Sequence, residues 1–140
     1  MAELDEASRV AQTSAGPIEF ASSGAGPTLL LFHGGPGGHD QGLILQPLVE
    51  EGFRLVSPSR PGYLRTPLEV GATHAEQADA MAALLDALDI EEVIACGFSA
   101  GGPVALQFAA RHANRTVGLL LECAVSQCYR PEVSAFVKAL

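Results

Sequence analysis

The residues with the clearest chemical potential lie between Val93 and Gln107, in the sequence VIACGFSAGGPVALQ. A short apolar run meets a glycine-flanked serine, Ser99, and a segment rich in Ala and Leu follows at once. This order predicts a strand, a sharp turn and a helix, with the serine hydroxyl exposed on the turn. Gly97 and Gly101 would let the backbone pack closely around it. Because the first N–H groups of a helix favour negative charge, the pattern predicts a nucleophilic serine.

A second glycine-rich stretch, HGGPGG at residues 33–38, directly follows the apolar run Thr28–Phe32. Glycines after a first strand can cradle a dinucleotide phosphate, but the spacing G-x-G-x-x-G is absent and Pro36 removes a donor. An acyl-transfer serine instead needs two donors for the oxyanion that forms during attack. Ala100, immediately after the serine, supplies one N–H by its position. Gly35 is expected to supply the other.

The segments that must position these two loops alternate between strands and helices. Apolar runs without polar alternation predict strands buried on both faces, and capped segments with helical spacing predict helices. The predicted strands are Arg9–Thr13, Ile18–Ser22, Thr28–Phe32, Phe53–Val56, Val93–Cys96 and Val117–Leu121, and the predicted helices are Asp40–Glu51 (short or kinked), Thr73–Leu88 and Ala100–Ala113. The repetition predicts an α/β fold, a mostly parallel sheet with helices on both faces. The reactive loops would meet at the carboxyl edge of this sheet.

Composition excludes several classes of function. The chain has 140 residues, of which 48% are hydrophobic and 17% charged, as in a soluble globular protein. Its net charge of -8, with eight basic residues and no basic run, argues against nucleic-acid binding. The acidic N-terminus is no signal peptide, and no apolar stretch is long enough to span a membrane.

The three cysteines show no metal-ligand spacing, and no metal or cofactor is expected. Cys96 and Cys123 each close an apolar run, so they are expected to be small buried hydrophobes, and Cys128 follows them. The odd count favours reduced thiols and a cytoplasmic location.

Three motifs together resemble the α/β-hydrolase superfamily, in particular its small carboxylesterase-type and proline-iminopeptidase-like members. They are HGGPGG at 33–38, SRPGY at 59–63 and GFSAGG at 97–102. The segment AARHANRTVGLLL is also similar to the family's passage from helix to strand, so the resemblance runs from about Ile18 onward.

The resemblance implies a serine hydrolase that acts on an ester or related small acyl substrate, without a cofactor. It implies that Ser99 is the nucleophile and that Gly35 and Ala100 donate their backbone N–H groups to the oxyanion. It places residues 60–63 near the site entrance with no catalytic role. We expect a flexible tail at 1–8, the N-terminal part of the hydrolase core at 9–125, and the start of a lid at 126–140, the cap and later strands being absent.

The family order is nucleophile, then acid, then histidine, and no histidine follows residue 112. His33 is expected to shape the oxyanion loop, and His39 is a remaining candidate for the base. His74 is expected to be a solvated residue at a helix start, and His112 a charge partner at a helix end. The catalytic histidine is therefore expected to be missing.

Glu122 closes the run Val117–Leu121, a strand-end position that some relatives use for the catalytic acid. The simpler interpretation is a carboxylate without a catalytic role. A serine without a base is a poor nucleophile, so the chain alone is expected to be weakly active or inactive.

Two other classes of function remain open. The chain could be a non-catalytic, hydrolase-derived binding module or one half of a split enzyme, with an exposed apolar strand that self-associates or receives a C-terminal partner. Alternatively, the same serine could serve cofactor-free lyase or perhydrolysis chemistry. Dehalogenation is disfavoured, because relatives with that activity carry Asp where this chain has Ser99.

Overall fold

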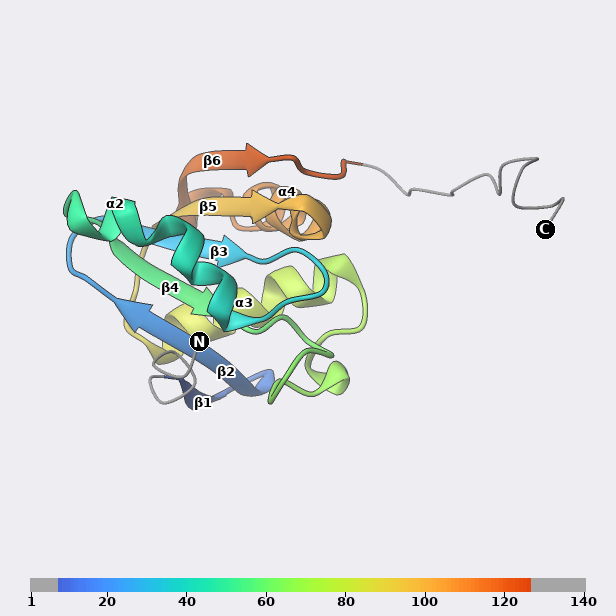
Figure 1. Ribbon diagram of the computed structural model, residues 1–140. Coiled ribbons are helices and arrows are strands. Elements are labelled where there is room, and N and C mark those ends of the chain that lie inside the picture. Colours follow the sequence, from blue (N-terminus) through green and yellow to red (C-terminus); the bar gives the residue numbers. More distant parts are fainter. Residues whose placement is uncertain (1–7, 127–140) are drawn as a thin grey trace, which may run out of the picture.

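The computed structural model describes residues 8–126, which form a single twisted sheet flanked by helices (Figure 1). The strands are β1 (Arg9–Thr13), β2 (Gly16–Ser23), β3 (Thr28–Phe32), β4 (Arg54–Pro58), β5 (Val93–Phe98) and β6 (Thr116–Glu122). Their spatial order is β1-β2-β4-β3-β5-β6. β1 and β2 pair antiparallel with their neighbours, whereas β4, β3, β5 and β6 run parallel. The predicted α/β architecture with a mostly parallel sheet is confirmed.

Helices cover both faces of the sheet, as the sequence predicts. The helical segments are η1 (His39–Leu45), α2 (Gln46–Glu50), η2 (Leu68–Val70), α3 (His74–Ala87), η3 (Ser99–Gly101), α4 (Gly102–Arg111) and η4 (Ala113–Arg115). The larger apolar cluster joins α3 and α4 to one face. A smaller cluster joins η1 and α2 to the other face. Alternate residues of β3 belong to the two clusters, which explains why its sequence is apolar without alternation.

Local signals in the sequence agree with the helix boundaries. Thr73 caps α3, and its hydroxyl accepts a hydrogen bond from the Glu76 N–H while the Glu76 side chain accepts one from the Thr73 N–H. The predicted helix at 40–51 is broken into the 3-10 turn η1 and the short α2, with Pro47 in the first turn of α2. Gly52, at φ +98°, directly follows this segment.

β6 departs from the prediction that its apolar run is buried on both faces. Among residues 8–126 it is an edge strand, so only β5 covers one of its sides. Val117 is 60% exposed, and Leu119, Leu120 and Leu121 are each 41% exposed. An apolar strand is buried only where other elements cover it on both sides. The sequence pattern shows that the residues are suited to burial but not whether such neighbours exist.

Cys123 is exposed, so the prediction of a buried residue is wrong at this position. It follows the exposed edge strand β6, which explains the difference. Cys96 is buried as predicted, and burial raises the pKa of its thiol to about 11. Cys128 and most of the predicted tail and lid lie outside the described residues, apart from Ser8 and Ser126.

Candidate active site

Ser99 is an exposed residue on a sharp turn between β5 and the helical segment η3–α4. Its backbone has φ +46°, a left-handed conformation that is unfavourable for any residue with a Cβ atom. The neighbouring glycines make the turn possible. A Cβ atom on Gly97 would lie 2.7 Å from the Ala105 Cβ, and one on Gly101 would overlap the Phe32 carbonyl. The predicted strand, sharp turn and helix are all present.

The glycine loop after β3 lies directly beside this serine. A Cβ atom on Gly34 would be 3.1 Å from the Ser99 Cβ. The Gly34 N–H donates to the Gln41 side-chain oxygen at 2.9 Å, and Pro36 has no N–H. Within residues 34–36, the N–H of the exposed Gly35 is therefore the one left to meet a ligand. Ala100 lies in the first helical turn, where N–H groups have no intrahelical acceptor.

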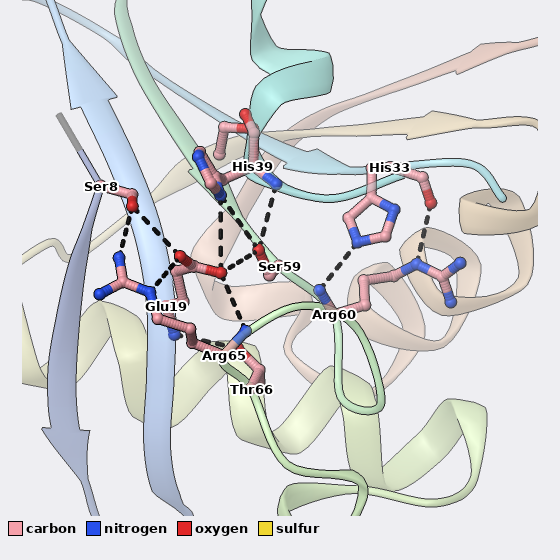
Figure 2. A network of polar contacts seen from close by, with 9 residues as sticks. Ser8, Glu19, His33, His39, Ser59, Arg60, Arg65 and Thr66 are labelled. Atoms are coloured by element: carbon pink, nitrogen blue, oxygen red, sulfur yellow. Dashed lines mark hydrogen bonds and ion pairs between the residues drawn. The ribbon is translucent and has the colours of Figure 1, made fainter. Parts of the chain in front are cut away.

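His33 is a buried support of this loop. Its Nδ1 donates to the Gly34 carbonyl at 2.6 Å. Its Nε2 accepts the Arg60 N–H at 2.9 Å (Figure 2). Together these bonds define the neutral tautomer that carries its proton on Nδ1. Burial lowers the pKa of His33 to about 4, although the hydrogen bond to Gly34 opposes the shift. His33 is therefore neutral near pH 7, and both of its ring nitrogens are engaged in holding the loop.

Arg60 and Tyr63 pack against His33 from the loop that follows β4. The Arg60 Nε donates to the His33 carbonyl at 2.8 Å, and its guanidinium lies 4.9 Å from the Tyr63 ring centre. The Tyr63 ring meets the His33 ring edge-on at 4.8 Å. A Cβ atom on Gly35 would lie 3.3 Å from the Tyr63 hydroxyl, so this side chain borders the glycine loop.

The other histidines have partners elsewhere. The buried His39 Nδ1 lies 3.3 Å from the Ser59 hydroxyl and 3.6 Å from a Glu19 oxygen. His112 Nε2 is hydrogen-bonded to Asp79 at 2.8 Å, which joins the end of α4 to α3. His74 is the exposed first residue of α3.

Glu122, the candidate acid, is the last residue of β6. In the parallel register it lies opposite Phe98, the residue that precedes Ser99. It is exposed, and the Cys123 thiol lies 3.6 Å from its carboxylate. The backbone that follows returns to the elbow, because the Val125 N–H donates to the Ser99 carbonyl at 3.0 Å. Glu122 is thus at the same sheet edge as the serine.

Glu19 in β2 is an important residue that the sequence analysis missed. Its carboxylate is buried, with 3% of the side chain exposed. It accepts hydrogen bonds from the Arg65 Nε at 2.6 Å, the Arg65 N–H at 3.1 Å and the Ser59 hydroxyl at 2.9 Å (Figure 2). These bonds tie β2 to the loop that carries Arg60 and Tyr63. A charged residue inside the otherwise apolar run Ile18–Ala21 was the available signal, since buried charges need partners.

The carboxyl group of Glu19 is strongly acidic. Burial alone would raise its pKa, but hydrogen bonds from Arg65 and Ser59 and the nearby His39 outweigh burial and lower the pKa from 4.5 to about 2. Glu19 is consequently ionised at neutral pH.

Within residues 8–126, no group of three or more His, Cys, Asp or Glu side chains is arranged to hold a metal ion. None of the helices in that range combines the length and apolar character needed to cross a bilayer.

A mostly parallel sheet with an exposed serine on a strained strand-to-helix turn, beside a glycine loop from the adjacent strand, is an arrangement typical of α/β proteins of the hydrolase type. The family model described as alpha/beta hydrolase fold matches residues 27–136. The chain belongs to the α/β-hydrolase family.

Relatives and solved structures agree with this assignment. The chain is 37% identical over 112 residues to the uncharacterized hydrolase YcgS of Bacillus subtilis, covering 80% of this chain and 39% of that protein. It is 35% identical over 111 residues to the pimeloyl-[acyl-carrier protein] methyl ester esterase of Aromatoleum aromaticum, covering 78% and 42%. An alpha/beta hydrolase fold protein from Nakamurella multipartita has 43% identity and a TM-score of 0.85, over 88% of this chain and 43% of that one. The chain thus spans about 40% of the length of these relatives.

The strain at Ser99 has a measurable consequence. Because Ser99→Ala keeps a Cβ atom at φ +46° and Ser99→Gly removes it, the glycine variant is expected to be more stable by about 1 kcal/mol. Urea unfolding of both variants measures the difference. In an ordinary helical turn alanine would be the more stable of the two, so that order would contradict a strained elbow.

The low pKa of Glu19 predicts acid sensitivity. Its ionised form contributes stability above pH 4.5, and this contribution is lost as the pH falls from 4.5 toward 2. The shift corresponds to about 3 kcal/mol. Glu19→Gln should therefore flatten the dependence of the unfolding free energy on pH in this window, measured by urea unfolding. The exposed Glu92→Gln is the control, and an unchanged slope in Glu19→Gln would contradict the assignment.

Proposed function

We propose that this chain carries the nucleophile and the oxyanion hole of a serine hydrolase that acts on a small ester or related acyl substrate. The observation that supports this function best is the exposed Ser99, held at φ +46° beside the glycine loop 34–38. The similarity to a methyl ester esterase of Aromatoleum aromaticum supports the choice of an ester.

In the proposed reaction, the Ser99 Oγ attacks the acyl carbon of the substrate. The carbonyl oxygen becomes an oxyanion, which accepts hydrogen bonds from the Gly35 and Ala100 N–H groups. The bond to the leaving alcohol then breaks, the alcohol takes up a proton, and water hydrolyses the acyl-serine in a second attack of the same kind.

The proton of the Ser99 hydroxyl needs a base, but three of the four described histidines are engaged elsewhere, and the fourth, His74, is the exposed first residue of α3. His33 uses both ring nitrogens to hold the loop, and His112 is bound to Asp79. His39 lies against Ser59 and Glu19. We therefore assign the base to a residue outside 8–126. Glu122, which ends β6 at the carboxyl edge of the sheet near Ser99, is the candidate acid among the described residues.

Ser99 is expected to react with a fluorophosphonate at pH 9, where hydroxide can accept its proton. The Oγ–phosphorus bond forms, the phosphorus–fluorine bond breaks, and mass spectrometry locates the label. Without a base, hydrolysis of p-nitrophenyl acetate at pH 7 should show little Ser99-dependent turnover.

Ser99→Ala is the control for both measurements. Equal labelling of this variant would contradict the nucleophile assignment. Robust turnover that disappears in Ser99→Ala would instead show that residues of this chain already supply the base.

A second candidate function is a docking module or one half of a split hydrolase, and the edge strand β6 favours it. Large apolar side chains are exposed along Val117–Leu121, and no proline or charge interrupts the run. Such an edge is open to pairing with another strand. In a symmetric antiparallel pair centred on Leu119, Glu122 would lie opposite Thr116, so the two carboxylates would not meet.

We expect the isolated chain to self-associate through β6, with an average mass in analytical ultracentrifugation that rises with concentration. Leu119→Lys should shift the equilibrium toward the monomer by tenfold or more, because it places a charge at the centre of the edge. Ile44→Lys, at a 60% exposed apolar residue of η1, is the control. A folded wild type that stays monomeric at all concentrations would exclude this interface.

A further inference from the structure

The side chain of Gln41, on η1, spans the glycine loop beside Ser99. Its Oε1 accepts the Gly34 N–H at 2.9 Å, and its Nε2 donates to the Pro36 carbonyl at 3.0 Å. Because one partner is a donor and the other an acceptor, the two bonds fix the orientation of the amide group. A single side chain therefore closes a ring across residues 34–36, on either side of Gly35.

The loop is shaped to receive this side chain. A Cβ atom on Gly37 would fall on the Gln41 amide, so any other residue there would displace it. A loop with four glycines has many accessible conformations, and holding it in one of them costs conformational entropy. The two hydrogen bonds of Gln41 offset part of this cost at the place where the loop meets Ser99.

Gln41 is itself anchored to the sheet. Its N–H donates to the Gly38 carbonyl at 3.1 Å. At the start of the same turn, the His39 carbonyl accepts the Ser57 hydroxyl at 2.7 Å, and the His39 N–H donates to the Ser59 hydroxyl at 3.2 Å. The end of β4 thus holds η1, and η1 holds the glycine loop through Gln41.

We propose that Gln41 is a positioning residue for the oxyanion hole. Its hydrogen bonds to the Gly34 N–H and the Pro36 carbonyl fix the backbone of residues 34–36. The Gly35 N–H is thereby directed toward the substrate oxygen at Ser99. This inference rests on the proposed serine-hydrolase function, since the Gly35 N–H acts only once Ser99 has attacked.

The test compares Gln41→Met, which keeps the length of the side chain but removes both hydrogen bonds, with Gln46→Met. Gln46 lies five residues further along and lines a cavity between the η1–α2 segment and β2 and β4, so the same chemical change is made away from the loop. The 140-residue chain and each variant are labelled with a fluorophosphonate at pH 9. The measured quantities are the labelling rate of Ser99 and the ³¹P chemical shift of the phosphonyl-serine.

Gln41→Met is expected to slow the labelling of Ser99 at least tenfold, because a misplaced donor no longer stabilises the developing charge on the phosphonyl oxygen. The ³¹P shift should move away from the wild-type value, whereas Gln46→Met should change neither quantity. A purely structural role would lower the melting temperature of Gln41→Met but leave the shift of the folded adduct unchanged.

The outcomes separate the two proposals. If wild type is labelled at Ser99 and Gln41→Met matches it in rate and shift, the role of Gln41 is overturned while the nucleophile stands. If folded wild type takes no label at Ser99 at pH 9 even with imidazole added as a diffusible base, the missing base no longer explains the result, so the proposed hydrolase function is overturned and the positioning role of Gln41 falls with it. Hydrogen exchange of the Gly34 N–H then reports whether the bridge exists as a structural bond alone.

Discussion

The structure depends on a close backbone contact between the serine turn and the end of β3. Gly101 lies so near the Phe32 and His33 carbonyls that a Cβ atom has no room there. This contact sets the distance between two loops that are more than sixty residues apart in sequence, and it places Ser99 beside Gly34. Van der Waals repulsion rises steeply at this range, so close packing can hold Ser99 in its left-handed conformation.

A network of polar groups, most of them buried, begins at His33 and holds the glycine loop in place. Neutral His33 links the loop to Arg60, and the Glu19 carboxylate links the Arg60 loop to β2 through Arg65 and Ser59. Each buried polar atom in this network would be costly if it lost its partner, so the groups stabilise one arrangement against the alternatives open to a glycine-rich loop. The glycine loop beside Ser99 is thus held in place by these contacts.

Within residues 8–126, the sheet that organises the site ends in two edge strands, β1 and β6. β1 pairs only with β2 and exposes one large apolar residue, Val10, whereas β6 pairs only with β5 and exposes Val117, Leu119, Leu120 and Leu121. The relatives are more than twice as long as the part of them that this chain matches. Among the described residues, the sheet that carries Ser99 therefore keeps an exposed apolar edge strand, and the chain spans about 40% of the length of these relatives.

Local sequence determined much of this protein. The glycine-flanked Ser99, the capping box at Thr73 and the apolar runs of β3 and β5 predicted the elbow, the helix and the order of the elements, because each depends on neighbours within a few residues. Tertiary structure alone decided the partners of Glu19, the tautomer of His33 and the bridge made by Gln41. These contacts join segments that are distant in the sequence, or residues that come together only when a loop folds back on itself. Tertiary structure also decided that β6 and Cys123 are exposed, because burial depends on which strands lie alongside and not on the apolar character of the run itself.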